Sequence, residues 1–383
     1  MTVEETFKRG LGLQKAGDLA AAEGAYRDVL KAVLHAAAFH NLVLIMQRTG
    51  RIEEADAVIA RALSLAPGHP RLMNTQAMQL RLKRQFPEAL ALYEQILAQA
   101  PDDPGARWGY AMTLLACGRL AEAWPFYEAR PERLQVEGWA APSAFKPSRG
   151  EDLTGRRLLV WFEQGLGDQI LAARFLPLLK GAEVTYMGPP TLRRLFGRLG
   201  VDYRPVEQPA RVSGYDFWTM PLSLPAVLGV TAGTLPRSPY LAGTPQRVEG
   251  RVGVMWRGNP AQDNDHHRSL PPALGARLLS LPGAVSLAPE DTGVKDMQDT
   301  ADLIAGLDLV ISVDTSVAHL AGAMGKPVWV LLPARGWDWC WPRHDATLWH
   351  PSARAFTQPA PGQWEPVIDA VERELRPRAE GSP

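Results

Sequence analysis

The sequence has few cysteines and no excess of charge of either sign. Only two of its 383 residues are cysteines, Cys117 and Cys340, which excludes a disulfide framework and an all-cysteine zinc site and fits a reducing compartment. Lysine plus arginine equal aspartate plus glutamate at 41 each. Nothing in this balance favours non-specific binding to nucleic acid or to an anionic membrane surface. We therefore expect a globular protein without a nucleic-acid partner.

Long apolar runs are also lacking. No stretch approaches the ~20 apolar residues that a membrane-spanning helix needs. The first residues include Glu4 and Glu5 and do not form the apolar core of a signal peptide. These absences predict a cytoplasmic chain without a membrane span.

The first 130 residues contain an internal repeat. The motif GRIEEA begins at residue 50, returns as RQFPEA at residue 84 and as GRLAEA at residue 118, so the step is 34 residues. An earlier copy begins at Gly17. The same step separates apolar or aromatic positions and prolines that follow the motif, namely Ile59, Tyr93 and Tyr127, and Pro67 and Pro101.

This pattern resembles the tetratricopeptide repeat, a pair of helices whose small residues allow close contact and whose aromatic residue fills the gap between them. The resemblance implies a helical domain over residues 1–130 with about three and a half repeats. Arg84 departs from it, because it stands where the other copies have the turn glycine. Repeats of this kind usually expose a concave surface, so we expect a peptide or protein ligand. The alternative is that the helices only brace the following domain.

From residue 151 the pattern changes to short apolar strands that alternate with helices, which is typical of parallel β-α-β units. A stretch rich in proline and glycine at residues 235–250 separates two such series. We expect a linker at 131–150, a first Rossmann-like lobe at 151–240 and a second at 241–383. Ligands of open α/β sheets bind beyond the carboxyl ends of the strands, so a cleft between the lobes is the expected site. Strands are predicted at 156–162, 183–186, 216–220, 251–256, 284–287, 307–312 and 327–332.

The first candidate site follows a predicted strand and reads Gly165-Leu166-Gly167-Asp168. Ile170 stands where a dinucleotide fingerprint has its third glycine, and no Gly-Lys-Ser/Thr ending is present, so hydride transfer and ATP hydrolysis are disfavoured. Glycines let the backbone approach a ligand. Asp168 either caps the helix that starts here or faces the cleft and accepts a proton from a hydroxyl.

The second candidate site is the segment VDTSVAHLAGAMGKP at residues 313–327. A strand, a hydroxyl-rich turn and a helix start form an arrangement that suits an anion, because helix N–H groups and the helix dipole point at it. Taken singly, Thr315 and Ser316 could be ordinary N-caps and His319 a hydrogen-bonded core histidine. Opposite a glycine turn, the set favours a diphosphate.

Three segments together resemble a known family. They are VWFEQGLGDQILAARFLPLL at 160–179, MWRGNPAQDNDHHRSLP at 255–271 and LDLVISVDTSVAHLAGAMGKPVWVLLP at 307–333. In this order behind repeats, they are similar to bacterial glycosyltransferases that join tetratricopeptide repeats to a lobe pair of the heptosyltransferase type. The resemblance implies a GT-B fold, a nucleotide-sugar donor, no metal, and a final helix that crosses back to the first lobe.

The resemblance also implies roles for single residues. Asp168 would be the general base of an inverting displacement, and Arg268 would face the donor phosphates where heptosyltransferases have a lysine. Ser316 replaces the glycine usual in that family, so an ADP-heptose donor is not assumed. The implied donor site consists of Gly165, Gly167, Trp256, Arg257, Asn259, Arg268, Asp314, Thr315, Ser316 and His319.

Some features are expected to be less specific. Asp263-Asn264-Asp265 with His266 and His267 imitates a metal-binding motif, but adjacent polar residues in a loop are expected to be solvated. Five tryptophans lie near the C-terminus, namely Trp337, Trp339, Trp341, Trp349 and Trp364. The first three could stack on a sugar or pack beneath the final helix.

The sequence favours sugar transfer from a nucleotide sugar to an acceptor hydroxyl, with a protein held by the repeats as acceptor, such as flagellin or another surface protein. Two other functions stay open. One is a non-catalytic repeat scaffold with a vestigial nucleotide-binding lobe pair, and the other is a nucleotide-sugar epimerase or hydrolase. Product analysis separates them.

Overall fold

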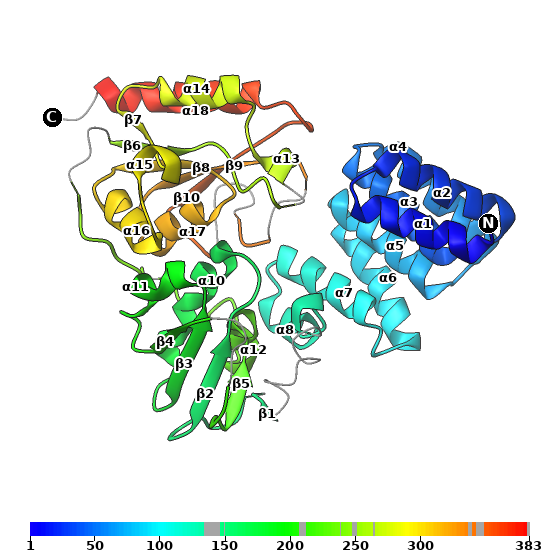
Figure 1. Cartoon of the computed structure of the whole chain (residues 1–383), viewed down its shortest axis with the longest axis horizontal. Coiled ribbons are helices and arrows are strands. Elements are labelled where there is room, and N and C mark those ends of the chain that lie inside the picture. The colour runs from blue at the N-terminus through cyan, green and yellow to red at the C-terminus, as the bar shows by residue number, and fades with distance from the viewer. Residues whose placement is uncertain are drawn as a thin grey trace. The chain divides into compact units, whose positions relative to one another are not determined.

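A computed structural model of the chain divides it into two compact units, Met1–Cys117 and Gly118–Pro383 (Figure 1). The structure describes all residues except 134–145, 149, 207–211, 238, 247–250, 263–264, 336–338, 342–347 and 381–383.

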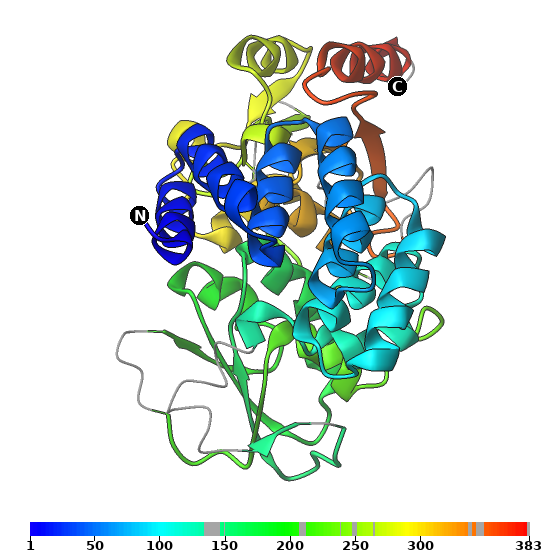
Figure 2. The same cartoon turned by 90° about the vertical axis from the view of Figure 1, so that its right-hand side faces the viewer.

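The first unit consists of helices that pack against their neighbours in the sequence (Figure 2). Its helices are α1 (Val3–Lys15), α2 (Leu19–Ala32), α3 (Ala36–Arg48), α4 (Ile52–Leu65), α5 (Pro70–Leu82), α6 (Phe86–Gln99) and α7 (Pro104–Ala116). Pro67 and Pro101 follow the ends of α4 and α6. The predicted helical repeat region is confirmed.

The first residue of each copy of the repeat motif lies in the turn between two paired helices, and the backbone of this turn explains why it is usually glycine. Gly17, Gly50 and Gly118 adopt φ values of 84°, 77° and 74°, in the left-handed region that favours glycine. Arg84 occupies the same turn with a φ of 61°. The departure at Arg84 therefore keeps the repeat geometry and accepts a strained backbone for a residue with a Cβ.

Glycine and tyrosine fit together between the helices of the first unit. A Cβ atom at Gly109 would lie 2.3 Å from the hydroxyl oxygen of Tyr93, and one at Gly10 would lie 2.7 Å from a ring carbon of Tyr26. Both tyrosines are fully buried. The predicted pairing of small and aromatic residues is confirmed, and it fixes how closely the helices approach.

In its described residues, the second unit contains two parallel sheets of five strands each. The first has the order β1-β5-β2-β3-β4 and the second the order β10-β9-β8-β6-β7. The first sheet consists of β1 (Lys146–Pro147), β2 (Arg157–Trp161), β3 (Glu183–Gly188), β4 (Asp202–Pro205) and β5 (Phe217–Thr219). The second consists of β6 (Val252–Met255), β7 (Ala284–Ser286), β8 (Leu309–Val313), β9 (Val328–Leu332) and β10 (Ala353–Thr357).

Each strand order contains a switch point, which is a pair of neighbouring strands from which the chain continues in opposite directions across the sheet. In the first sheet the switch lies between β2 and β5, and in the second between β6 and β8. Ligands of doubly wound sheets bind beyond the carboxyl ends of the strands at such points. The loops after β2, β6 and β8 are therefore the segments that can build a site, and all the strands that precede the predicted site residues are present.

Short helices connect these strands. In and before the first lobe they are α8 (Leu120–Tyr127), α10 (Leu166–Ala172), α11 (Arg193–Phe196) and α12 (Leu224–Val227), with 3₁₀ segments at Ala173–Leu178, Pro190–Leu192 and Pro221–Ser223. In the second lobe they are α13 (Asp265–Arg268), α14 (Pro272–Leu279), α15 (Pro289–Thr292), α16 (Met297–Ala305), α17 (Ser316–Ala323) and α18 (Glu365–Glu380). None of the described helices is both long and apolar enough to cross a bilayer.

The boundary between the units differs from the sequence-based one. The first unit ends at Cys117, whereas the repeat pattern extends to residue 130. Trp124 of α8 donates a hydrogen bond of 2.8 Å to the Val230 carbonyl oxygen in the second unit, and Arg130 is buried there. The helix that completes the fourth repeat motif is thus part of the α/β unit.

The final helix does not cross back to the first lobe over its described side chains. Val367, Ile368 and Val371 of α18 join the core of the second sheet. Arg277 of α14 donates hydrogen bonds of 2.7 Å to both Asp369 and Glu372, and the two helices lie side by side in Figure 1. The crossing implied by the resemblance is therefore wrong for residues 365–375.

Residues 243 and 244 of the predicted linker at 235–250 are held against the second lobe. A Cβ atom at Gly243 would lie 2.1 Å from the Ala301 carbonyl oxygen, and the Thr244 amide donates to Asp302 Oδ1 at 2.7 Å. Both partners belong to α16. This part of the connection between the lobes is therefore attached to the second lobe.

Candidate active site

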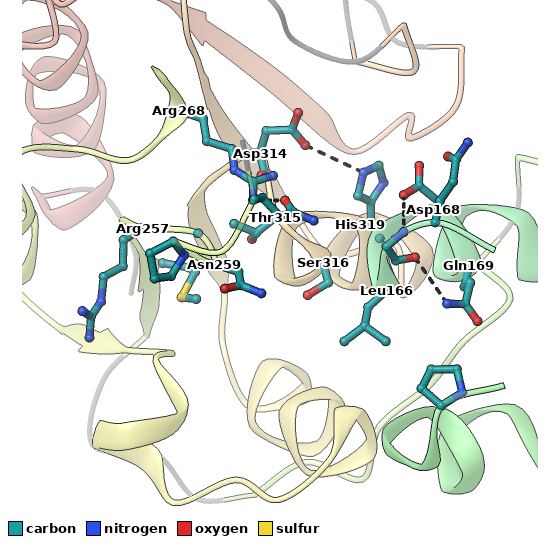
Figure 3. Close-up of a pocket in the computed structure, with 18 of the residues that line it drawn as sticks. Leu166, Asp168, Gln169, Arg257, Asn259, Arg268, Asp314, Thr315, Ser316 and His319 are labelled. Carbon is teal, nitrogen blue, oxygen red and sulfur yellow. Dashed lines mark hydrogen bonds and ion pairs between the residues drawn. The ribbon is translucent and has the colours of Figure 1, made fainter. Parts of the chain in front are cut away.

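A cavity of about 680 Å³ lies between the two lobes of the second unit. Its size is within the range of small-molecule sites, ~300–1,000 Å³. The first lobe contributes the turn after β2, and the second contributes the loops after β6 and β8 (Figure 3). Among its lining residues are Phe162, Gln164, Gly165, Leu166, Gly167, Asp168, Gln169, Pro189, Arg257, Asn259, Gln262, Arg268, Glu290, Asp314, Thr315, Ser316 and His319.

Asp168 lies in the first turn of α10 and lines the cavity. Its Oδ2 accepts a hydrogen bond of 3.0 Å from the Gly165 amide, so it caps the helix while facing the cavity. Burial raises the pKa of Asp168 to about 7 against the opposing effect of the Gly165 amide, and the carboxylates of Asp314 and Glu163 raise it further. An aspartate with a pKa near 7 is matched to proton transfer at neutral pH.

The start of α17 faces the same cavity from the second lobe. Thr315 precedes the helix with extended backbone, and its hydroxyl lies 3.0 Å from that of Ser312 and makes no capping bond. Ser316 also lines the cavity (Figure 3). The first N–H groups of a helix have no partner within the helix, and here no side chain of the cap residue takes them. This arrangement suits an anion.

Arg268 ends α13 beside the start of α17. It donates hydrogen bonds to the Asp314 carbonyl oxygen at 2.9 Å, to Asp265 Oδ1 at 3.1 Å and to Gln262. Its side chain keeps 18% of its surface exposed and lines the cavity. The guanidinium is thus held at the N-terminus of α17, where it adds a fixed positive charge.

Asp265 differs from the expectation of a solvated loop. It is buried, and its two oxygens accept from Arg268 and from the Ser269 hydroxyl, the latter at 2.9 Å. Asp263 and Asn264 lie outside the described residues. Within the described part of the chain, no group of three histidine, cysteine, aspartate or glutamate residues gathers as metal ligands would. Asp265 serves to orient Arg268.

Comparisons with known proteins agree with this geometry. Residues 7–70 and 80–140 match models of the tetratricopeptide repeat, and residues 273–331 match the model of glycosyltransferase family 9 (heptosyltransferase). Protein FlbA of Caulobacter vibrioides is 26% identical over 91% of this chain and 69% of its own length. The chain thus carries two matches to the tetratricopeptide repeat and, over residues 273–331, one match to glycosyltransferase family 9.

Two solved structures are also similar. An O-GlcNAc transferase mutant of Thermobaculum terrenum is 15% identical over 99% of this chain and 91% of its own length, with a TM-score of 0.37. A tetratricopeptide repeat protein of Parabacteroides merdae is 21% identical over 36% of this chain and 55% of its own, with a TM-score of 0.28. The fold assignment rests on the sheet orders of this chain.

Of the three donor residues predicted directly after β6, two line the cavity and one does not. Arg257 and Asn259 lie in the loop after β6, and Arg257 pairs with Glu290 at the end of the cavity far from Asp168 (Figure 3). Trp256 is absent from the lining, because its ring packs against Gly275 of α14, where a Cβ atom would lie 2.4 Å from it. The expectation that Trp256 lines the pocket is therefore wrong.

His319 lies at the wall of the cavity but is buried in the protein. Its Nδ1 lies 3.2 Å from His350 Nε2, and its Nε2 lies 3.9 Å from Asp314 Oδ1. Burial lowers the pKa of His319 to about 3, and the Arg174 charge lowers it further. The ring is therefore neutral, and the core-histidine interpretation describes its contacts.

Gly167 owes its residue type to His319. A Cβ atom at Gly167 would lie 2.7 Å from His319 Cδ2, which is closer than side chains approach one another. The glycine expected to let a ligand approach thus lets the second lobe approach α10. Gly165 and Gly167 both also line the cavity.

The C-terminal tryptophans pack within the domain. Trp341 and Trp349 are buried, and Trp364 joins the core of the second sheet at the start of α18. Trp339 contacts the Trp124 ring of α8 with centroids 6.3 Å apart. None of these four lines the cavity, and Trp337 lies outside the described residues.

Several cavity residues were missed by the sequence analysis. Gln262 and Glu290 line the second-lobe side, and Gln164 and Gln169 line the first-lobe side. Gln164 carried no sequence signal, although it is one of the described residues other than glycine with a left-handed backbone, at a φ of 54°. Gln262 lies inside the segment 255–271, whose resemblance marked the region without marking that residue.

Proposed function

We propose that the glycosyltransferase domain transfers a sugar from a nucleotide sugar to an acceptor hydroxyl, with inversion and without a metal ion. Asp168 would accept the proton of the acceptor hydroxyl as the sugar–phosphate bond breaks. The diphosphate would leave at the start of α17, beside Arg268. The donor base and sugar stay outside this proposal.

One observation carries the proposal, namely that a carboxylate and an anion site face each other across one cavity. Asp168 belongs to the first lobe, whereas Thr315, Ser316 and Arg268 belong to the second. An inverting displacement needs the base and the leaving group on opposite sides of the reacting carbon. A sugar between the two lobes would meet this requirement.

The leaving diphosphate would be stabilised by fixed charges of the protein. Negative charge accumulates on it as the bond breaks, and preorganised donors are most effective where charge develops. The N–H groups at the start of α17 and the Arg268 guanidinium would supply them. This supports a reaction in which no metal ion is needed.

The acceptor is proposed to be a protein or peptide bound by the repeats. Stacked repeats of this type expose surfaces that suit extended ligands, and the first unit has their geometry. Flagellin or another surface protein is the class of acceptor that we would assay first. The repeats would then supply substrate affinity, and the cavity the chemistry.

Asp168→Asn tests the proposed base. The amide keeps an oxygen that can accept from the Gly165 amide but cannot take a proton, so transfer should fall by about a hundredfold or more, the order of a general base's contribution. Nucleoside diphosphate affinity should stay within about twofold, because binding does not need the base. Product analysis by mass spectrometry and calorimetry measure the two; full transfer by the variant would remove Asp168 from this role.

Arg268→Ala tests the donor site. Loss of a charge-assisted contact to a phosphate should weaken binding of a nucleoside diphosphate by about tenfold or more. Arg251→Ala is the matched control, because Arg251 is an exposed arginine of the same lobe that pairs with Asp308. A thermal-shift panel of nucleoside diphosphates and CMP selects the nucleotide. Equal affinities for the two variants would contradict the assignment.

A further inference from the structure

Two buried charges meet directly before the turn that carries Asp168. Arg130, whose side chain is fully buried, donates to Glu163 through Nε at 2.6 Å and Nη2 at 3.0 Å. Glu163 is equally buried and lies at the end of β2, where the chain leaves the first sheet. The paired fork of an arginine and a carboxylate is a directional contact and not only an electrostatic one.

The same pair fixes a third segment. The Leu222 amide donates to Glu163 Oε1 at 2.8 Å, and Arg130 Nη2 donates to the Ser223 hydroxyl at 2.7 Å. Both residues belong to the 3₁₀ segment after β5. Arg130 therefore joins the chain after α8, the end of β2 and the end of β5, the strands that flank the switch point of the first sheet.

The turn that follows Glu163 needs such support. Gln164 adopts a left-handed backbone with a φ of 54°, which is unfavourable for a residue with a Cβ. Gly165 comes next, and its amide donates to Asp168. Strained backbone persists only where the surroundings fix it. Glu163, held by Arg130 and the Leu222 amide, is the fixed point directly before the strained residue.

Arg130 also departs from the repeat pattern. Ala62 and Ile96 precede it at steps of 34 residues, so the position is small or apolar in the repeats. An arginine there cannot pack between repeat helices and needs a partner for its charge. Glu163 is one such partner, and Glu128, which accepts from Arg130 Nη1 at 3.0 Å, is another.

We propose that Arg130 and Glu163 are positioning residues that hold the turn 163–168 so that the Asp168 carboxylate faces the cavity. This inference rests on the proposed role of Asp168 as a base. Although burial alone would lower the pKa of Arg130, the neighbouring Glu163 carboxylate raises it above its ordinary value, so the guanidinium stays charged. The Glu163 charge in turn contributes to the raised pKa of Asp168.

Three full-length variants test the proposal. Arg130→Gln removes the charge, Arg130→Lys keeps the charge with fewer donors, and Glu163→Gln removes the carboxylate charge while keeping an acceptor for the Leu222 amide. Arg119→Gln is the control, because Arg119 lies directly before α8 and pairs with Glu122 at the protein surface. Transfer rates are measured well below the unfolding temperature of each variant, so that loss of stability alone does not lower them.

Arg130→Gln should lower kcat by about a hundredfold, since small misplacements of reacting groups have effects of this order. Nucleoside diphosphate affinity should stay within about twofold, and Arg130→Lys should recover part of kcat. Glu163→Gln should move the acid limb of the pH profile to lower pH, because removal of a negative charge lowers the pKa of Asp168. Unchanged kcat and pH profile in Arg130→Gln and Glu163→Gln would overturn the proposal, even if both variants unfold at lower temperature.

A readout without substrate separates this inference from the proposed function. In protein labelled with ¹³C-aspartate, the Asp168 carboxyl signal is assigned by its loss in Asp168→Asn and titrated with pH. Glu163→Gln should lower the titration midpoint, and Arg119→Gln should not change it. If the wild-type protein transfers no sugar, the proposed function fails, whereas this titration still decides the positioning; an unchanged midpoint and chemical shift would overturn it.

Discussion

At the scale of single residues, Asp168 combines two roles that the sequence presented as alternatives. Its carboxylate caps α10 through the Gly165 amide and also lines the cavity. As the proposed base, Asp168 would have to be ionised, and an ionised carboxylate in a buried site destabilises the folded protein. The pKa of Asp168 reflects this cost, because it rises from the ordinary value of 3.8 to about 7.

This cost predicts a pH-dependent gain of stability in Asp168→Asn. The pKa of Asp168 is raised in the folded protein, so folding favours the protonated form and the wild type loses stability as pH rises from about 4 to about 7. The neutral variant does not share this loss. Its unfolding temperature should therefore exceed that of the wild type at pH 8, and the difference should shrink toward pH 5. Equal unfolding temperatures at pH 8 would mean that the carboxylate is not destabilised.

The transfer rate should also depend on the titration of Asp168, but it should rise with pH where the stability falls. The base is active only when deprotonated, so the rate should rise with pH and level off above about 7. A pH profile of kcat measures this. A flat profile between pH 5 and 8 would exclude Asp168 as the titrating base.

Gly167→Ala tests the close approach of the lobes. A Cβ atom would lie 2.7 Å from His319 Cδ2, and overpacking of this kind costs about 1–3 kcal/mol. We expect a lower unfolding temperature and slower transfer. Gly12→Ala is the control, because the space around this glycine of α1 is open, and alanine there should be neutral or stabilising. Thermal unfolding of both variants decides the matter.

At the scale of elements, the lobes are joined by two kinds of contact. Arg174 is buried and donates to the carbonyl oxygens of Pro236 and Trp349, at 3.2 and 2.7 Å, which connects the first lobe to the linker and to the second lobe. Arg194 of α11 is exposed and pairs with Asp296 and Asp299 at the start of α16. The first contact is protected from solvent, whereas the second can break and reform.

Arg194→Ala should therefore weaken the contact between the lobes without unfolding the second unit. Exposed ion pairs contribute little, so nucleoside diphosphate affinity should fall only by about threefold. The difference from the wild type should disappear in high salt, because salt screens exposed pairs. Calorimetric titrations at two salt concentrations measure this. A difference that persists at high salt would contradict an effect through these exposed ion pairs.

The sequence predicted the central strands well and the edge strands poorly. β2 and β9 are apolar runs buried on both faces, and this composition is recognisable without a structure. β4 and β10 were missed, since they mix charged and apolar residues at or near the sheet edges. The predicted helix after β2 also changes to a 3₁₀ segment at Ala173, with Pro177 inside it.

At the scale of the whole molecule, the family resemblance located the cavity, but contacts between distant residues stayed hidden. Asp168, Arg268 and Thr315 were identified from local motifs, and all three line one cavity. The pairing of Arg130 with Glu163 and the packing of Trp256 on Gly275 depend on segments that only the fold brings together. Local patterns contain no information on such partners.

The division into two units leads to a prediction about their separate tasks. If the repeats bind the acceptor and the second unit contains the cavity, changes in the first unit should alter the affinity for a protein acceptor but not for a nucleotide. Gly109→Ala, which would force Tyr93 from its place in the repeats, should raise the KM for a protein acceptor. Calorimetry should give an unchanged Kd for the nucleoside diphosphate. A weakened nucleotide affinity would contradict this division.

We propose that Asp168 of the first lobe activates an acceptor hydroxyl, which then attacks a nucleotide sugar bound by the second lobe. The most direct test is a single-turnover reaction at pH 8 with the nucleotide sugar that the binding panel selects, in which wild type and Asp168→Asn are both saturated with donor. We expect acceptor glycosylation by the wild type and a donor-bound but inactive variant. Glycosylation at equal rates by both proteins would contradict it.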